Sequence, residues 1–473
     1  MKKYQLIVIG GGAGGLVVAA GAASFGMSTA LISEGPLGGD CLWSGCVPSK
    51  SLIQSAKIVH TTQKAKQFGL QVEGKVDFTT AQQRLDDAIA TIQKHDDPER
   101  FTQLGIDVYQ DKASFVGKNE VKIGMGEVLH GKRIVVATGS SPVLPPIPGL
   151  AEAGYITNET LFSLEQKPSS LAVIGAGPIG LELAQSLARF GTKVVVLEAD
   201  DLFLRNEDHE VVPYLERKLK KEMELHTGAS VKQVEQTKRG KKVVVELQGE
   251  RKEWMVEEIL VAAGRKPNTE ALRCEKAGIQ VNQRGAIEVN ERLQTSQRHI
   301  YAVGDVNGRY PFTHAASLEG KTVVSNAVFG LRQKVSYEGL PWVTYTDPEL
   351  FHLGKTEEEL KDENQDYRVY KVELDDVDRY VADRDTDGMI KILTDRRGRI
   401  LGAHAVGVSV GEVMQEVVFA KQYGHKIGDL AQVVYPYPTR AAAVGRVADM
   451  YWREKLFAGW IPKVTQKFVQ WFR

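Results

Sequence analysis

The chain has 473 residues and carries 60 Lys plus Arg against 60 Asp plus Glu, so its formal net charge at pH 7 is zero. This length predicts two or three domains, and the balanced charge gives no reason to expect a nucleic-acid partner. Membrane insertion and secretion are not expected either. No apolar run reaches the roughly 18 residues that span a bilayer, and the N-terminus runs directly into a predicted strand at 5 to 9. We therefore expect a cytoplasmic protein.

A glycine-rich loop at 10 to 15 follows this first strand and precedes an alanine-rich helix. Gly10 permits a tight turn, Gly12 lets the backbone approach a pyrophosphate, and Gly15 lets the helix pack on the strand. Glu34 ends the next predicted strand, where a carboxylate can accept hydrogen bonds from ribose hydroxyls. The strand, loop, helix and acid together predict a dinucleotide-binding unit.

Two of the three cysteines lie in the stretch Gly-Gly-Asp-Cys-Leu-Trp-Ser-Gly-Cys-Val-Pro-Ser-Lys at 38 to 50. The spacing of Cys41 and Cys46 suits one helical turn, so that both sulfurs can face the same side and close a small disulfide ring. Two buried apolar thiols would be the alternative, but the flanking glycines and Pro-Ser-Lys favour a redox-active pair. Cys274 lies outside every motif, and we predict a buried, inert thiol there.

The remainder of the first part is predicted as helices and strands that end at a proline-rich connector. The helix of the cysteine stretch continues beyond it, and a second, amphipathic helix spans 78 to 104. Short strands follow and lead into Thr138-Gly139-Ser140. Four prolines between 142 and 148 stiffen the chain, so a domain boundary is predicted near residue 150.

The strand, glycine loop, helix and acid then occur a second time. Gly175, Gly177 and Gly180 repeat the positions of the first loop, and Glu198 ends the following strand. The spacing from the first loop glycine to the acid is nearly the same in both copies. Two copies predict that two dinucleotides bind.

Charge around Glu198 indicates which nucleotide the second unit prefers. Its carboxylate can bond a free 2′-hydroxyl but would repel a 2′-phosphate, and Asp200 and Asp201 add negative charge. NADH is therefore favoured. Arg205 is the nearest following cation and keeps NADPH open as the alternative.

Beyond residue 340 the pattern changes to strands with tight turns and a helix at 411 to 423. Residues 454 to 473 form an amphipathic tail that Pro462 interrupts. This tail could pack on its own dimer, or it could rest on a membrane surface and let the protein meet a lipid-soluble quinone. Its apolar residues are Phe457, Trp460, Ile461, Val464, Phe468, Trp471 and Phe472, and its cations are Lys455, Lys463, Lys467 and Arg473.

Several motifs together resemble the flavin-dependent pyridine nucleotide-disulfide oxidoreductases, which include glutathione reductase, dihydrolipoamide dehydrogenase and mercuric ion reductase. They are the cysteine stretch at 38 to 50, Gly-Arg-Lys-Pro-Asn at 264 to 268 and Ala-Val-Gly-Asp at 302 to 305. The resemblance implies an α/β fold with two Rossmann-like dinucleotide-binding domains and a C-terminal α+β dimerisation domain. The FAD-binding domain would comprise 1–149 and 270–335, the NAD(P)-binding domain 150–269, and the dimerisation domain 340–473.

The resemblance also implies a homodimer that uses FAD and NAD(P)H, and it assigns roles to side chains. Cys46 would lie against the flavin, and Cys41 would be the exposed interchange thiol. Lys50 would lie by the flavin and pair with Glu182. Asp305 would bind the ribityl hydroxyls, beside a helix that begins near residue 313. The other implied contacts are Thr138, Gly139, Ser140, Thr313, His314 and Ala315 for FAD and Gly264 for NAD; no metal site is implied.

The sequence departs from the family pattern at three positions. Asp40 stands where better-known members carry Thr, close to the flavin pyrophosphate. Tyr437 and Ala442 stand where the reductases of organic disulfides carry a His and the Glu that orients it. A phenol with a pKa near 10 is a poor proton donor at neutral pH compared with an imidazole near 6.5. We therefore expect slow reduction of glutathione disulfide and lipoamide.

In having a Tyr at position 437, the sequence resembles mercuric ion reductase, whose metal substrate needs no proton. That enzyme passes the metal through a C-terminal cysteine pair, however, and this sequence has no cysteine after Cys274. The main hypothesis is a mercuric-reductase-like enzyme that reduces an unassigned small molecule or metal ion. The alternatives are a quinone-type flavin reductase at a membrane surface, dihydrolipoamide dehydrogenase or glutathione reductase activity, and a non-enzymatic redox sensor.

Overall fold

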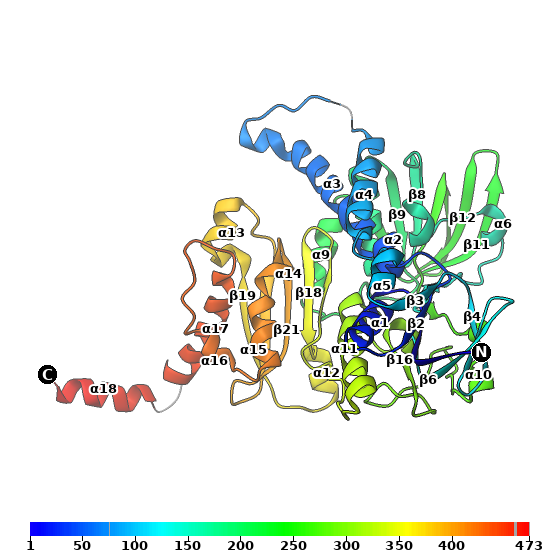
Figure 1. The fold of residues 1–473 in the computed structure, drawn as a ribbon. Helices are drawn as coiled ribbons and strands as arrows, with labels where there is room; N and C mark the ends of the chain where they lie inside the picture. Colours follow the sequence, from blue (N-terminus) through cyan, green and yellow to red (C-terminus); the bar gives the residue numbers. More distant parts are fainter. Residues whose placement is uncertain (75, 458–460, 473) are drawn as a thin grey trace. The chain divides into compact units, whose positions relative to one another are not determined.

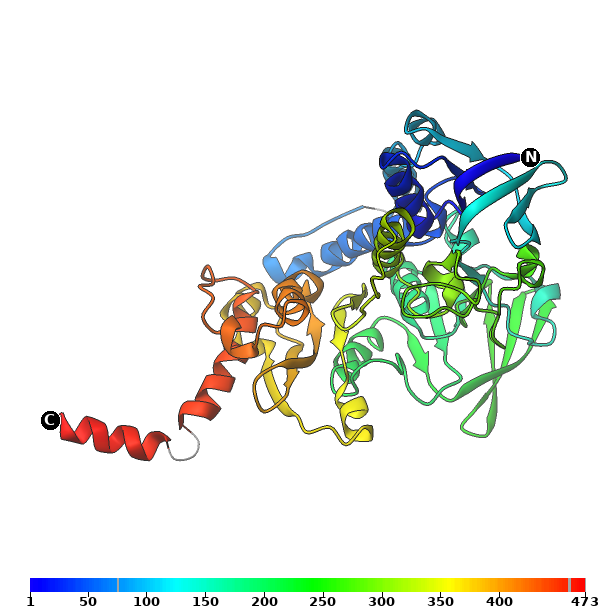
Figure 2. The same ribbon diagram turned by 60° about the horizontal axis from the view of Figure 1, so that its bottom comes forward.

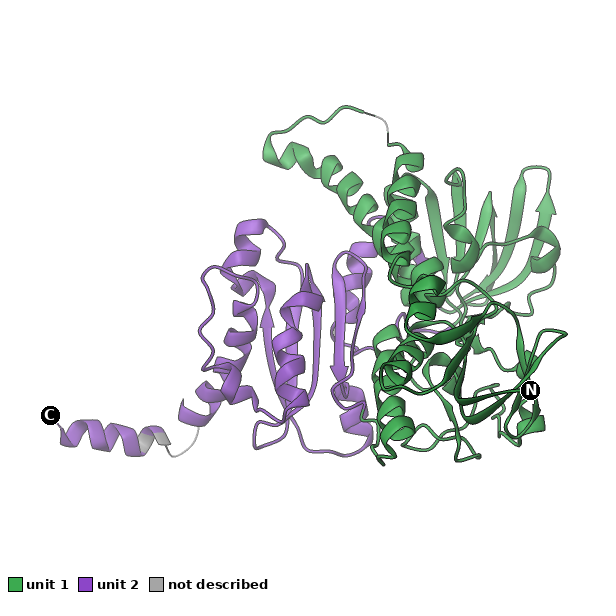
Figure 3. Cartoon of the chain, viewed as in Figure 1, with its two compact units in different colours: residues 1–199, 228–336 green, residues 200–227, 337–473 purple. Residues whose placement is uncertain are grey.

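The structure is a computed structural model that describes residues 1–74, 76–457 and 461–472. It consists of two compact units, one of residues 1–199 and 228–336 and the other of residues 200–227 and 337–473 (Figure 3). Both units combine helices with sheets, which confirms the predicted mixed α/β class. The predicted boundary near residue 150 does not coincide with a boundary between these two units.

The first unit contains a seven-stranded sheet in the order β3-β2-β1-β6-β5-β4, with β16 beside β6. The pairs β1–β2, β2–β3, β1–β6 and β6–β16 are parallel, and the last four residues of β1 are buried apolar side chains, as expected for a parallel sheet covered on both faces. Its strands are β1 (Lys2–Ile9), β2 (Thr29–Ile32), β3 (Ile106–Tyr109), β4 (Ala113–Gly117), β5 (Glu120–Ile123), β6 (Val128–Val136) and β16 (Ile300–Ala302).

A second parallel sheet of the first unit contains strands in the order β9-β8-β14, and an antiparallel sheet has the order β11-β12-β13. A two-stranded antiparallel ribbon, β7 with β15, joins the turn after β6 to the segment after β14. The strands are β7 (Ser140–Pro142), β8 (Ser170–Ile174), β9 (Lys193–Leu197), β11 (Ala229–Thr237), β12 (Gly240–Leu247), β13 (Glu250–Val256), β14 (Glu258–Val261) and β15 (Arg265–Pro267).

Long helices of the first unit pack on one another as well as on the sheets (Figure 1 and Figure 2). Helix α1 packs on α11, and α3 packs on both α4 and α8. The helices are α1 (Ala13–Ser24), α2 (Gly39–Trp43), α3 (Cys46–Lys64), α4 (Phe78–Gln93), α5 (Pro98–Gln103), α6 (Leu150–Ala153), α7 (Asn158–Leu161), α8 (Pro178–Arg189), α10 (Cys274–Ala277) and α11 (Thr313–Phe329).

Two predicted helices of this unit are each divided in two. The cysteine stretch forms α2 and α3, because Ser44 and Gly45 leave helical backbone angles. The predicted helix at 78 to 104 forms α4 and α5. Asp97 is extended, as residues before proline usually are, and its side chain accepts a hydrogen bond from the Glu99 amide to cap α5.

The second unit is built around a five-stranded antiparallel sheet in the order β17-β18-β21-β20-β19. The predicted helix at 411 to 423 is also divided, at Met414. The strands of this sheet are β17 (Pro341–Thr344), β18 (Glu349–Gly354), β19 (Arg368–Glu373), β20 (Met389–Thr394) and β21 (Ile400–Gly407), and strand β10 (Glu224–His226) lies outside it. The helices are α9 (Val212–Leu219), α12 (Glu357–Asp362), α13 (Asp378–Asp383), α14 (Val410–Val413), α15 (Gln415–Gln422), α16 (Ile427–Leu430), α17 (Ala442–Phe457) and α18 (Ile461–Trp471).

Helix α18 covers part of the predicted amphipathic tail. Phe468 and Trp471 are exposed, and their neighbour Phe472 stacks edge-on against Trp471. Trp460 and Arg473 lie outside the described residues. Among the helices in the described part of the chain, none combines the length and the apolar character needed to cross a membrane.

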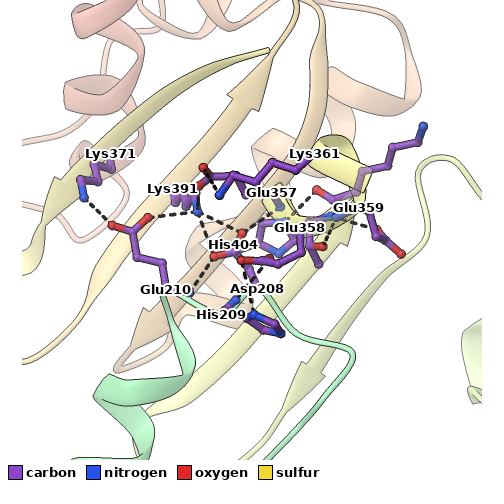
Figure 4. A network of polar contacts seen from close by, with 12 residues as sticks. Asp208, His209, Glu210, Glu357, Glu358, Glu359, Lys361, Lys371, Lys391 and His404 are labelled. Carbon is purple, nitrogen blue, oxygen red and sulfur yellow. Dashed lines mark hydrogen bonds and ion pairs between the residues drawn. The ribbon is translucent and has the colours of Figure 1, made fainter. Parts of the chain in front are cut away.

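A buried ammonium group holds the segment 200–227 to the sheet of the second unit (Figure 4). The Nζ atom of Lys391, on β20, lies 3.0 Å from Asp208 Oδ1, 3.0 Å from Glu210 Oε2 and 2.5 Å from Glu357 Oε2. The side chains of Lys391 and Asp208 are both 0% exposed. Burial alone would raise the pKa of Glu357, but hydrogen bonds from Lys391, Lys361 and Tyr367 lower it to about 2.

Replacing this lysine tests the contribution of the cluster to stability. Lys391→Met should lower the free energy of unfolding by about 3 to 5 kcal/mol at pH 7, because it leaves buried carboxylates without their cation. Lys371→Met is the matched control. Lys371 also binds Glu210 but is half-exposed, so its loss should cost at most about 1 kcal/mol. Urea unfolding measures both, and a loss below about 1 kcal/mol for Lys391→Met would contradict this account.

The same cluster predicts how stability depends on pH. The pKa of Glu357 is about 2 in the folded chain and about 4.3 in an unfolded one. Its contribution is therefore complete above about pH 5 and is lost as the pH falls towards 2. Urea unfolding between these pH values should show a smaller acid-induced loss for Lys391→Met than for the unmodified protein.

Candidate active site

The first glycine loop has the shape of a pyrophosphate cradle. A Cβ atom on Gly10 would lie 2.2 Å from the Ala137 carbonyl oxygen, and one on Gly15 would lie 2.0 Å from the Gly10 oxygen. Neither position can therefore carry a side chain. A Cβ on Gly12 would meet only Gly39 Cα, at 4.0 Å, so the backbone there is open to a ligand. Helix α1 begins immediately afterwards, and the free amides of its first turn favour a bound anion.

The second loop repeats this geometry. A Cβ on Gly175 would lie 2.5 Å from the Ala262 oxygen, and one on Gly180 would lie 2.2 Å from the Gly175 oxygen. Around Gly177 the space is open within 4 Å, and α8 begins at the next residue. The residues of both loops thus fit the pyrophosphate of a dinucleotide. Gly264, the other predicted NAD contact, has a φ of 127° and is also open within 4 Å.

The two glutamates that are predicted to bind ribose hydroxyls, Glu34 and Glu198, have different surroundings. Glu198 Oε2 accepts a hydrogen bond of 2.7 Å from the Ala176 amide, which fixes the carboxylate against the second glycine loop. Glu34 Oε1 lies 3.1 Å from Lys112 Nζ, and both of these side chains are about two-thirds exposed. Glu198 is thus the more firmly positioned of the two.

The two cysteines lie on either side of the break between α2 and α3. Cys41 is on α2, and Cys46 begins α3. Both are free thiols, and Thr313 Oγ1 lies 3.4 Å from Cys46 Sγ. Thr313 begins α11, so the structure brings together two predicted flavin contacts.

The two thiols differ in acidity. A hydrogen bond from Cys41 lowers the pKa of Cys46 to about 6, against the effect of burial, and Thr313 and Lys50 act in the same direction. The same hydrogen bond and burial raise the pKa of Cys41. These shifts favour Cys46 as the thiolate and Cys41 as the protonated donor.

The structure shows the predicted Lys50–Glu182 pair. Lys50 lies one turn into α3, and its Nζ donates a hydrogen bond of 2.9 Å to Glu182 Oε2 on α8. Glu182 is only 5% exposed. A carboxylate this deeply buried is usually paired, and the packing of α3 on α8 brings the two side chains together.

Asp40 has a counter-ion that the sequence did not reveal. Arg265, on β15, lies 3.3 Å from Asp40 Oδ2 and donates hydrogen bonds to the Ser140 hydroxyl (2.8 Å) and carbonyl (2.7 Å). The Ser140 hydroxyl in turn donates to Asp305 Oδ2 at 2.6 Å. Three predicted positions near the flavin thus share one guanidinium group.

The predicted contacts next to these residues have clear local partners. The Thr138 hydroxyl donates to the Asn268 carbonyl at 2.8 Å, and Gly139 accepts a hydrogen bond of 3.0 Å from the Asn268 amide. Ala315 is fully buried in the first turn of α11. The ring of His314 stacks on Phe312 with the ring centres 5.5 Å apart.

Tyr437 lies in the second unit and has a partner that the sequence did not reveal either. Its side chain is 77% exposed, and its hydroxyl donates a hydrogen bond of 2.8 Å to Asp378 Oδ2. Arg446 NH2 lies 2.9 Å from the other oxygen of Asp378. The hydrogen bond to Asp378 raises the pKa of Tyr437. Ala442 lines the same cavity of about 170 Å³ as Tyr437.

Over the described ranges of the chain, there is no group of three or more His, Cys, Asp or Glu side chains that could hold a metal ion. Cys274, outside every motif, is buried, and burial raises its pKa to about 11. The chemistry-bearing groups of the first unit therefore centre on Cys41 and Cys46.

Comparison with known proteins identifies the family. Residues 4–320 match the family model of the pyridine nucleotide-disulphide oxidoreductases, and residues 340–448 match that of their dimerisation domain. A mercuric reductase of Lysinibacillus sphaericus is 34% identical over 93% of this chain and 81% of its own length. A dihydrolipoyl dehydrogenase of Bacillus subtilis (strain 168) is 33% identical over 94% and 97%.

Among solved structures, the HOCl-induced flavoprotein disulfide reductase RclA of Escherichia coli, as its Cu(II) complex, is similar with a TM-score of 0.84. It is 28% identical, and the match covers 95% of this chain and all of that one. These matches also confirm the predicted fold class. The chain belongs to the pyridine nucleotide-disulphide oxidoreductase family and is a flavin-dependent enzyme of that family.

Proposed function

We propose that the protein is a cytoplasmic NAD(P)H-dependent reductase whose Cys41–Cys46 pair passes electrons to a small-molecule or metal-ion acceptor, as in mercuric reductase. The observation that carries the proposal is the placement of Cys41 on α2 and Cys46 at the start of α3, with Cys46 Sγ 3.4 Å from Oγ1 of the predicted flavin contact Thr313. FAD, when bound, would carry electrons from the pyridine nucleotide to the cysteine pair. The first glycine loop would hold its pyrophosphate.

The side chains around the pair prepare it for this role. Reduction of the disulfide to one thiol and one thiolate takes up two electrons and one proton. Its reoxidation passes the two electrons to the acceptor and releases the proton. Lys50 lowers the pKa of Cys46, and Glu182 holds the Lys50 ammonium group in place. These two residues would thus favour the thiolate form on the flavin side of the site.

The choice of acceptor rests on Tyr437 rather than on overall similarity. Mercuric reductases and dihydrolipoyl dehydrogenases match this chain about equally well. The phenol of Tyr437 keeps its proton at neutral pH, and the hydrogen bond to Asp378 raises its pKa further. A group that keeps its proton is a poor acid for a departing thiolate, whereas a metal ion needs no such proton.

We further propose a homodimer in which each active site receives Tyr437 of the partner subunit. The match to the dimerisation domain supports a dimer, and Tyr437 is mostly exposed in the single chain. The mass of one chain is 52.1 kDa, and native mass measurement should give twice this value. A stable, active monomer would rule out this arrangement.

The Cys41→Ser variant tests the route of the electrons. It should abolish NADH oxidation with thiol or metal acceptors, because the dithiol can no longer form. Cys274→Ser, which changes a buried thiol outside the site, is the control and should keep the activity. Quinone reduction that survives in Cys41→Ser would favour the quinone-type flavin reductase instead. If the unmodified protein oxidises NADH with none of the acceptors, the redox sensor remains.

The preference for NADH is tested at Glu198. A carboxylate facing a 2′-phosphate should cost about 1 to 3 kcal/mol, so kcat/KM should be about 5 to 150 fold higher for NADH than for NADPH. Glu198→Gln should reduce this ratio. Glu34→Gln, the equivalent change in the first dinucleotide unit, should leave the ratio unchanged. An equal or higher value for NADPH in the unmodified protein refutes the assignment.

The absence of the His–Glu pair in the sequence gives a further prediction. Reduction of glutathione disulfide and lipoamide should be about 10² to 10⁴ fold slower than in family members that have the pair. Tyr437→His combined with Ala442→Glu should recover part of this activity, whereas Tyr423→His, at another exposed tyrosine, should not. Steady-state kinetics with both disulfides checks this. Ordinary turnover by the unmodified protein would show that another group supplies the proton.

The membrane-surface alternative depends on the tail. Phe468, Trp471 and Phe472 are exposed in the chain, and the sequence has no acidic residue after Glu454. Such a helix suits an anionic lipid surface, but a second copy of the chain could also cover it. If the tail binds lipid, the full chain should sediment with anionic vesicles, whereas a chain ending at Trp452 should stay in the supernatant. If both stay in solution, the tail is a structural element.

A further inference from the structure

We propose that Asp40 and Arg265 form one positioning unit, which fixes the cysteine-bearing helix α2 to the flavin-side turn and cancels the charge that Asp40 adds beside the FAD pyrophosphate. The inference rests on the proposed use of FAD. It concerns a departure from the family pattern, since better-known members carry Thr at position 40. The two side chains come from distant parts of the sequence, α2 and β15.

The location of Asp40 follows from the backbone. A Cβ atom on Gly39, the preceding residue, would lie 2.7 Å from Gly12 Cα. The first turn of α2 therefore lies directly on the glycine loop that would hold the pyrophosphate. A carboxylate added at this point repels the phosphates unless a cation compensates it.

Both oxygens of the Asp40 carboxylate are engaged. Oδ1 accepts a hydrogen bond of 2.5 Å from the Ser44 hydroxyl and lies 3.4 Å from Nδ2 of the buried Asn158. Oδ2 lies 3.3 Å from the Arg265 guanidinium. The carboxylate therefore has a fixed orientation, and the residue that compensates its charge is Arg265.

Arg265 is well suited to serve two carboxylates at once. Its side chain is 16% exposed, it binds the Ser140 hydroxyl and carbonyl, and its Nε lies 4.0 Å from Asp305 Oδ2. The ribbon of β7 and β15 sets this geometry, because it pairs Arg265 with Pro142 and Pro267 with Ser140. A planar guanidinium with several fixed donors can hold such a cluster, and a lysine cannot reproduce it.

The unit also affects the redox-active thiols. Asp40 acts to raise the pKa of both Cys41 and Cys46. Removal of Arg265 alone would leave this charge uncompensated towards both the cofactor and the thiols. Removal of both side chains would take away the charge together with its partner, so the double variant should be less damaged than Arg265→Met.

The experiment is a double-mutant cycle of Asp40→Asn and Arg265→Met. FAD binding is measured by the release of flavin from the holoenzyme on dilution and ultrafiltration. Arg265→Met should weaken FAD binding by about 10 to 100 fold, and Asp40→Asn should stay within about threefold of the unmodified protein. The double variant should regain most of the loss. Lys266→Met, at the neighbouring exposed cation, is the control and should bind FAD normally.

A second readout follows the thiols. The pH at which iodoacetamide labels the reduced cysteines should move up in Arg265→Met, because Asp40 is then uncompensated, and should return in the double variant. Arg265→Lys keeps the charge and should bind FAD more tightly than Arg265→Met. If the methionine variant does not fold, Arg265→Lys is compared with the unmodified protein and should bind FAD less tightly. Normal FAD binding by Arg265→Met, equal binding by the Lys and Met variants, or strictly additive losses in the cycle would overturn the proposal.

The two readouts separate this proposal from the proposed function. If the unmodified protein binds no FAD, the proposed function fails. The labelling profile of the reduced chain still reports whether Arg265 compensates Asp40, because it requires no flavin. An unchanged profile in both single variants would then overturn the pairing itself.

Discussion

The interruption of the helix at Gly45 sets the positions of the two cysteines. A Cβ at this position would lie 2.8 Å from the Asp40 carbonyl oxygen, so a larger residue would force the two short segments apart. Because the chain turns here, Cys46 becomes the first residue of α3 while Cys41 stays on α2. The positive end of a helix favours a thiolate. The bond from Cys41 and the start of α3 thus act on the same sulfur.

The other contacts of the site start from the same two helices. Lys50 lies one turn beyond Cys46 and reaches Glu182 on α8, the helix that follows the second glycine loop. Asp40 immediately precedes Cys41 and reaches Arg265 and, through Ser140, Asp305. A shift of α2 or α3 would therefore disturb the cysteine pair and the contacts to both dinucleotide units together. This coupling explains how one short stretch can organise a large chain.

Local patterns in the sequence were sufficient for the glycine loops and the strands beside them, whereas the Lys50–Glu182 pair was expected only from the family resemblance. The division of α2 from α3 was not predicted. Pro98 did carry the signal for the break between α4 and α5. Arg265 and Asp378, by contrast, meet Asp40 and Tyr437 only through the tertiary fold. Residue spacing holds no information on such contacts.

The hydrogen bond between Tyr437 and Asp378 bears on the proposed acceptor. In a His–Glu pair the acid orients an imidazole that can take up and release a proton near neutral pH. Here the carboxylate binds the phenol hydroxyl and raises its pKa, so Asp378 strengthens the protonated state. A protonated phenol can orient a ligand or donate a hydrogen bond, but it cannot cycle a proton at each turnover. The bond to Asp378 thus adds to the case from the missing histidine for the proposed acceptor, which requires no proton at this position.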